Sequence, residues 1–117
     1  DTRGWVWTKL VATNDGPLPL ASACGAPLDE SRCIIFGGAA ISPDGYQSGA
    51  GLVAQDDTWL LTVKKDSVEW SALAKGPEAR IAATLSPVAP GSFVLQGGYD
   101  PSTKYTFDEL WLLTSDE

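Results

Sequence analysis

Few side chains of this chain could carry out chemistry, and the most telling omission is histidine. The sequence contains 2 cysteines, 15 aspartates and glutamates, 5 tryptophans and no histidine. Histidine is the commonest general base and metal ligand in proteins. Its absence excludes Ser-His-Asp and Cys-His catalysis within the chain, and any zinc or copper site that needs histidine. The sequence therefore predicts no catalytic residue, no metal site and no cofactor of its own.

The adjacent carboxylates Asp56 and Asp57 do not suit acid–base catalysis either. Neighbouring residues on a strand point to opposite faces of a sheet, so the two groups cannot act together on one substrate. Capping of the turn before the next strand is the simpler expectation for Asp57.

The two cysteines, Cys24 and Cys33, flank the segment Gly25–Arg32, which is expected to be a turn between two strands. A cross-strand disulfide forms if the paired strands bring their Cα atoms to about 5.5 Å. The alternative is a pair of small, buried apolar side chains. Two ligands without histidine are too few for a metal site.

Charge and hydropathy exclude two classes of partner. The formal net charge of -7 disfavours a nucleic-acid or anionic membrane surface. No apolar stretch approaches the roughly 18 residues that a membrane-spanning helix needs, and no segment has the pattern of a signal peptide. The sequence leaves the compartment open, with the cytoplasm favoured.

A repeated glycine doublet organises the chain. The apolar run Cys33–Gly38 ends in Gly-Gly, and so does its counterpart Phe93–Gly98. Each is followed by an acidic residue and a Trp-Leu-Leu run, at Asp57–Leu61 and at Asp108–Leu113. Two such units in the same order form an internal repeat, and a repeat is the strongest sequence signal of an architecture.

Each copy of the repeat predicts short β-strands between turn residues, and no segment shows sustained helical periodicity. The strands are named a to d in chain order within one unit. They are expected at Leu20–Cys24 and Arg80–Leu85 (a), Arg32–Phe36 and Ser92–Gln96 (b), Thr58–Val63 and Glu109–Thr114 (c), and Val68–Leu73 and Trp5–Leu10 (d).

The order of apolar strand, Gly-Gly, acidic residue and tryptophan resembles the kelch repeat over nearly the whole chain. The resemblance implies an all-β fold: a kelch-type β-propeller segment of about two blades of four-stranded antiparallel sheet, in the order d, a-b-c-d, a-b-c. Residues 1–10 would give strand d of a preceding blade, residues 17–73 a complete blade and residues 77–117 strands a to c of the next. The chain departs from the family pattern at Leu20, which stands where Arg80 supplies the usual arginine.

The resemblance also assigns structural roles. The doublets Gly37-Gly38 and Gly97-Gly98 are expected to adopt positive φ and to leave space beside them. Aromatic side chains of the same and the adjacent blade would fill that space, here Trp7, Trp59, Trp70 and Trp111. Trp5 lies beyond the repeat and is the candidate for a stacking surface.

In kelch-like propellers the b-to-c and d-to-a loops emerge on one face, which commonly binds a partner. The side chains best suited to anchor a protein there are Tyr46, Arg80, Tyr99 and Tyr105, since Tyr and Arg are favoured at binding hot spots. The expected function is a non-enzymatic protein–protein interaction scaffold. The alternatives are a carbohydrate-binding propeller, or a propeller segment of an enzyme whose active site lies outside this chain.

Two blades do not close a ring, because propellers usually have four to eight. The chain is therefore expected to be part of a longer propeller, to assemble head to tail with copies of itself, or to join different chains that supply the other blades. Its predicted partners are those blades and a protein bound by the loops, with no nucleic acid and no membrane insertion.

Overall fold

The computed structural model describes residues 4–41 and 52–115, and this part of the chain is all-β, with no helix that could cross a membrane. The strands are short and are bounded by Gly, Pro, Asp and Ser, as expected of chain segments that turn often. In chain order they are β1 (Val11–Ala12), β2 (Cys24–Pro27), β3 (Arg32–Phe36), β4 (Ala39–Ala40), β5 (Val53–Ala54), β6 (Thr58–Val63), β7 (Ser67–Ala72), β8 (Thr84–Ala89), β9 (Ser92–Gln96), β10 (Tyr99–Asp100), β11 (Tyr105–Thr106) and β12 (Leu110–Thr114).

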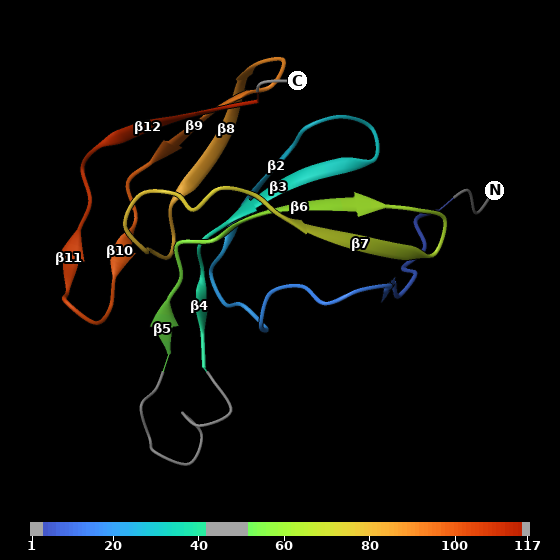
Figure 1. Ribbon diagram of the computed structural model, residues 1–117, viewed down its shortest axis with the longest axis horizontal. Helices are drawn as coiled ribbons and strands as arrows, with labels where there is room; N and C mark the ends of the chain where they lie inside the picture. The colour runs from blue at the N-terminus through green and yellow to red at the C-terminus, as the bar shows by residue number, and fades with distance from the viewer. Residues whose placement is uncertain (1–3, 42–51, 116–117) are drawn as a thin grey trace.

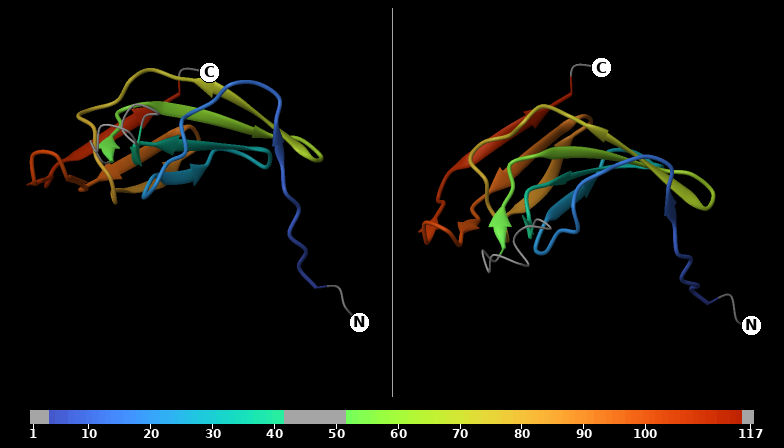
Figure 2. Two further views of the ribbon diagram at one scale, coloured as in Figure 1. Left: turned by 90° about the horizontal axis from the view of Figure 1, so that it is seen from below. Right: turned by 60° about the horizontal axis from the view of Figure 1, so that its bottom comes forward.

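Two larger sheets stand side by side, and neither closes on itself (Figures 1 and 2). The first has the order β1-β7-β6-β3-β2, in which β2, β3, β6 and β7 are antiparallel and β1 joins the edge in parallel. The second has the order β12-β9-β8 and is antiparallel. The short pairs β4/β5 and β10/β11 continue the two b-to-c connections as separate hairpins.

The pairing a-b-c-d expected for the first copy is the pairing observed. Strand b begins and ends as predicted in both copies, and so does strand c of the first copy. The bounds predicted for strand a are wrong in both copies, since the strand both begins and ends later, at Cys24–Pro27 and Thr84–Ala89. The residues before it instead form isolated bridges, Ala21 to Ala39 and Ile81 to Tyr99.

The hydrophobic core lies between the two sheets. Directly opposite residues on paired strands share a face. In the first sheet this rule places Ala26, Ile34 and Phe36 on the face toward the second sheet. There they pack against the second sheet's buried residues, Leu85, Phe93 and Leu95. Each sheet therefore supplies one apolar face to a common core.

Backbone hydrogen bonds also tie the sheets together. The Gly38 N–H donates to the Arg80 carbonyl at 3.0 Å, and the Ala82 N–H donates to the Ser22 carbonyl at 3.0 Å. The second bond joins the segments that precede the equivalent strands β2 and β8, and the first joins the end of β3 to the segment before β8. The relative position of the sheets is thus fixed by polar as well as apolar contacts.

The strand expected at Trp5–Leu10 is not formed, which corrects one prediction. Residues 4–10 are in no strand, and the side chains of Trp5 and Trp7 are fully exposed. A strand d pairs with strand c of its own blade, and no described residues supply strand c of a preceding blade. The strand c of the complete blade, β6, is already paired on both edges, with β3 and β7. The segment therefore extends away from the sheets, as Figure 2 shows.

Candidate interaction face

The two glycine doublets direct two hairpins out of the same edge of the molecule. Gly37 and Gly38 have φ of 71° and 88°, and Gly97 and Gly98 have φ of 69° and 107°. This left-handed region favours glycine, because a Cβ atom there is strained. Each doublet turns the chain from strand b into a short hairpin, and β4/β5 and β10/β11 project in the same direction (Figure 1). The predicted positive φ at the doublets is confirmed.

The space beside the doublets is not filled by tryptophan, which corrects a second prediction. A Cβ on Gly37 would lie 2.7 Å from the Arg80 carbonyl oxygen, and one on Gly98 would lie 2.9 Å from Arg80 Cδ. Aromatic rings instead fill the space beside two other glycines: Trp70 lies against Gly16 and Phe36 against Gly76. One glycine of each doublet, Gly37 and Gly98, is therefore needed for the close approach of Arg80.

Arg80 was expected on the binding surface, but only 1% of it is exposed. Its Nε donates to the Glu78 carbonyl at 3.0 Å and its Nη1 to the Gly97 carbonyl at 3.0 Å. Nη2 donates to Glu109 Oε1 at 3.1 Å, and the guanidinium carbon lies 3.8 Å from the ring centroid of Phe107. These contacts occupy all three guanidinium nitrogens, so Arg80 stabilises the fold and cannot anchor a partner.

Glu109 is the partly exposed partner of the buried Arg80 guanidinium. Its Oε1 also accepts a hydrogen bond from the Trp111 indole nitrogen at 2.8 Å. The indole N–H and then the Arg80 guanidinium hold the pKa of the Glu109 carboxyl below its usual range. The sequence analysis did not predict this cluster of Arg80, Phe107, Glu109 and Trp111. The alignment of Leu20 with Arg80 was a signal for it, because it shows that one copy of the repeat has a charge that the other lacks.

Of the predicted anchors, Tyr105 is the one that the structure exposes. Its side chain is 54% exposed on β11, and its ring meets Phe107 edge-on with centroids 4.8 Å apart. Tyr99, paired with Thr106 on the neighbouring strand, is half-buried. Tyr46 lies outside the described residues. The β10/β11 hairpin therefore presents one aromatic side chain that is both accessible and held in place.

Two carboxylates on the same side of the molecule share a lysine. Lys75 Nζ lies 2.6 Å from Asp57 Oδ1 and 3.1 Å from Asp56 Oδ1. The two carboxylates, Asp57 first, raise the pKa of Lys75. All three groups are at least a third exposed, so the pairs contribute little to stability.

The two cysteines are free, so of the two alternatives left open by the sequence the structure has the unbridged pair. Cys24 is opposite Phe36, and Cys33 is opposite Pro27. The two residues therefore lie on opposite faces of the sheet, where no rotation of their side chains brings the sulfur atoms together. Burial raises the pKa of both thiols, and Cys24 is the one that packs against the core between the sheets.

The tryptophans divide into two groups. Trp59 and Trp70 pack edge-on with ring centroids 6.0 Å apart on the outer face of the first sheet, and both are partly buried. Trp111, on β12 opposite Leu95, is 45% exposed, and Trp7 is fully exposed. The expected packing role is thus seen for Trp59 and Trp70 and in part for Trp111, whereas Trp7 lies in solvent.

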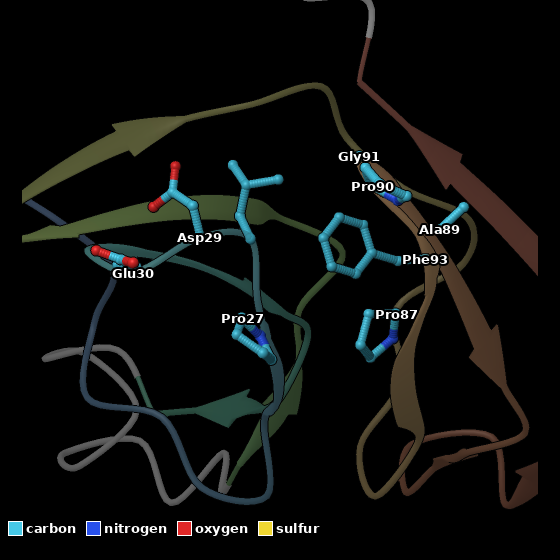
Figure 3. A pocket seen from close by; sticks show the side chains of 9 residues that line it. Pro27, Asp29, Glu30, Pro87, Ala89, Pro90, Gly91 and Phe93 are labelled. Carbon is cyan, nitrogen blue, oxygen red and sulfur yellow. The ribbon is translucent and has the colours of Figure 1, made fainter.

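A groove of about 570 Å³ opens at the far end of the sheets, between the β2–β3 and β8–β9 turns. Figure 3 shows the rings of Pro27 and Pro87 facing one another across it, with the Phe93 ring above them. Two carboxylates line it, Asp29 and Glu30, and Asp29 is already bound to Arg32 at 2.7 Å. The groove is a seam between the sheets, apart from the loops that define the interaction face.

Comparisons with known proteins support the fold alone. No protein-family model and no curated protein matches the chain. Among solved structures, YjhT superposes with a TM-score of 0.63 at 20% identity, covering 92% of this chain and 31% of its own length. A novel fungal alcohol oxidase of the AA5 family, in complex with copper, gives a TM-score of 0.55 at 15% identity, with coverage of 81% and 23%. YjhT has a propeller-like fold, and this chain spans about a third or less of either neighbour.

Proposed function

We propose that the chain is a kelch-type propeller segment that acts as a non-enzymatic scaffold for a protein partner. The observation that carries the proposal is the repeated exit of a hairpin from a Gly-Gly doublet, at β4/β5 and β10/β11, on one edge of two packed sheets. Rigid strands that present exposed loops are a common arrangement for recognition. Tyr105 is the proposed anchor on this edge.

We propose further blades as the second kind of partner. The outer face of the first sheet carries Trp59, Trp70 and Leu61, whereas the outer face of the second carries Leu110 and Leu112, which are 66% and 63% exposed. Through the repeat, the outer face of the first sheet corresponds to the inner face of the second, and the outer face of the second corresponds to the inner face of the first. Another blade seated on each would bury them as the central core is buried.

We propose no copper site in this chain like that of the fungal oxidase. The chain has no histidine, and in residues 4–41 and 52–115 no three Cys, Asp or Glu side chains come together to hold a metal. The available donors do not fit a copper centre.

Site-directed photocrosslinking tests the scaffold. A photoreactive residue at Thr103, in the β10–β11 turn, should crosslink a protein partner in extracts of the source cells, and the crosslink should weaken when Tyr105 is changed to alanine. The same probe at Glu30, in the β2–β3 turn, is the matched control and should capture no such partner. Equal capture from both positions, or capture that ignores Tyr105→Ala, contradicts the assignment of this face.

A further inference from the structure

Equivalent residues of the two repeat copies surround the Arg80 guanidinium in the second copy and a pocket in the first. In the second copy the Gly97 N–H donates to the Glu109 carbonyl at 3.4 Å, and in the first the Gly37 N–H donates to the Asp57 carbonyl at 3.2 Å. The backbone thus places Asp57 where Glu109 stands. A carboxylate precedes strand c in both copies.

The residue before strand a is what differs. The bridge between Ile81 and Tyr99 is repeated by the bridge between Ala21 and Ala39, which makes Leu20 the equivalent of Arg80. A leucine side chain carries no charge and is shorter than arginine. The first copy therefore keeps the acceptors of the guanidinium but supplies no guanidinium.

A pocket of about 190 Å³ lies at this position. A water molecule takes about 30 Å³ in the liquid, so the space exceeds what one water needs. The equivalents of the four groups around the Arg80 guanidinium all line it: Leu18 for Glu78, Gly37 for Gly97, Gln55 for Phe107 and Asp57 for Glu109. Trp59 lines it as well.

We propose that this pocket binds the guanidinium group of a ligand, with the Asp57 carboxylate and the Gly37 carbonyl as acceptors and the Trp59 ring beside it. Arg80 shows a related arrangement within this chain: one carboxylate, one glycine carbonyl and the Phe107 ring surround its guanidinium. In the first copy Gln55 replaces Phe107, and the aromatic ring of the pocket is that of Trp59. Planar donors match paired acceptors better than an ammonium group does, so the pocket should prefer guanidinium to ammonium. The ligand is either an arginine side chain of a protein or a small guanidinium compound.

Lys75 modulates the pocket. It holds Asp57 Oδ1 at 2.6 Å, but its side chain is 68% exposed. An exposed pair of this kind is weak, so an entering guanidinium can displace the ammonium group. Removing the lysine charge should therefore strengthen binding.

Titration with methylguanidinium, followed by nuclear magnetic resonance of the Trp59 indole N–H and the Gly37 amide, tests the pocket. Both signals should shift, and methylammonium at the same concentration should shift them much less. Asp57→Asn should weaken the affinity about tenfold, as expected for loss of a charge-assisted hydrogen bond. Lys75→Gln should tighten it.

Leu20→Arg is the decisive variant, because it places a guanidinium in the pocket covalently. The titration should then give no shift, whereas Leu20→Ala, which leaves the pocket open, should keep the response. Retained shifts in folded Leu20→Arg, or an unchanged affinity in Asp57→Asn, overturn the proposal. If Leu20→Arg does not fold, the Asp57→Asn result decides.

A capped Gly-Arg-Gly peptide separates the two sources of the guanidinium. Tighter binding of the peptide than of methylguanidinium assigns the pocket to an arginine of a protein partner. Equal binding assigns it to a small compound. The scaffold function is tested independently, by the Tyr105 crosslink. A negative result for the guanidinium pocket therefore does not contradict the scaffold function, and a negative crosslink does not contradict the pocket.

Discussion

The Arg80 guanidinium, which is almost completely buried, lies 3.1 Å from the Glu109 carboxylate at the exposed edge of the second sheet. Their sequence separation is large, and strands β8 and β9 and the β10/β11 hairpin must all be in place before the two meet. The contact between Arg80 and Glu109 therefore depends on the folding of the whole second sheet.

Arg80→Met should lower the free energy of unfolding by about 2–4 kcal/mol, because it removes several hydrogen bonds of a buried charge while keeping much of the side-chain volume. Urea denaturation at neutral pH measures the change. Arg32→Met is the control, since its pair with Asp29 is on the surface and should matter little. Equal effects of the two substitutions would show that Arg80 is not buried as described.

Glu109 should make stability depend on pH in the acid range. Its pKa in the folded protein lies below the ordinary value of 4.5, so the carboxylate form is favoured by folding. This stabilisation is fully present above the ordinary value and is lost as the pH falls through the folded value. The urea midpoints of the wild type and Glu109→Gln should therefore differ most at neutral pH and converge in acid. Glu69→Gln, at an exposed site on β7, is the matched control; a constant gap for Glu109→Gln across the range would refute the linkage.

Gly37→Ala should destabilise the protein more than Gly91→Ala. Both glycines have nearly the same φ, 71° and 72°, so both substitutions carry the cost of a left-handed alanine, about 1 kcal/mol. Only at position 37 would the new Cβ lie 2.7 Å from a backbone oxygen; at position 91 the nearest atom is 3.4 Å away. Thermal unfolding of the two variants measures the difference, and equal melting temperatures would contradict the close approach of Arg80.

Both cysteines should react as free thiols. Iodoacetamide added without reductant to the unfolded chain should label two sites, as shown by mass spectrometry. In the folded protein, burial raises the pKa of Cys24 above 9.0, so its alkylation should be slow at neutral pH and accelerate in alkali. Cys24→Ser identifies its contribution. An unlabelled chain two mass units lighter than expected would instead demonstrate a disulfide.

The isolated chain should self-associate through its two outer faces. Leu112 is 63% exposed on β12, and a charge there should oppose packing of another sheet. Light scattering should give a mass above that of one chain that falls with dilution, and Leu112→Glu should bring it toward the monomer. Glu69→Lys, a charge change on an exposed residue of β7, should leave the mass unchanged. A strict monomer at every concentration would exclude self-assembly.

Local pattern was sufficient for much of the fold. Strands β3, β6 and β9 were predicted with their observed bounds, because alternating apolar residues between turn signals define a strand from its own sequence. The segment Trp5–Leu10 is also rich in strand-forming residues but forms no strand, since no free strand c among the described residues lies beside it. Strand propensity becomes a strand only when a partner satisfies its hydrogen bonds.

Residue type and local spacing were enough to predict the repeat, the all-β class and the positive φ of the doublets, and the absence of histidine chemistry follows directly from composition. Tertiary structure decided which face each side chain takes. Register placed Cys24 and Cys33 on opposite faces, and the packing of one sheet on the other buried Arg80. The same packing left a pocket at Leu20, because equivalent backbones received side chains of different length and charge.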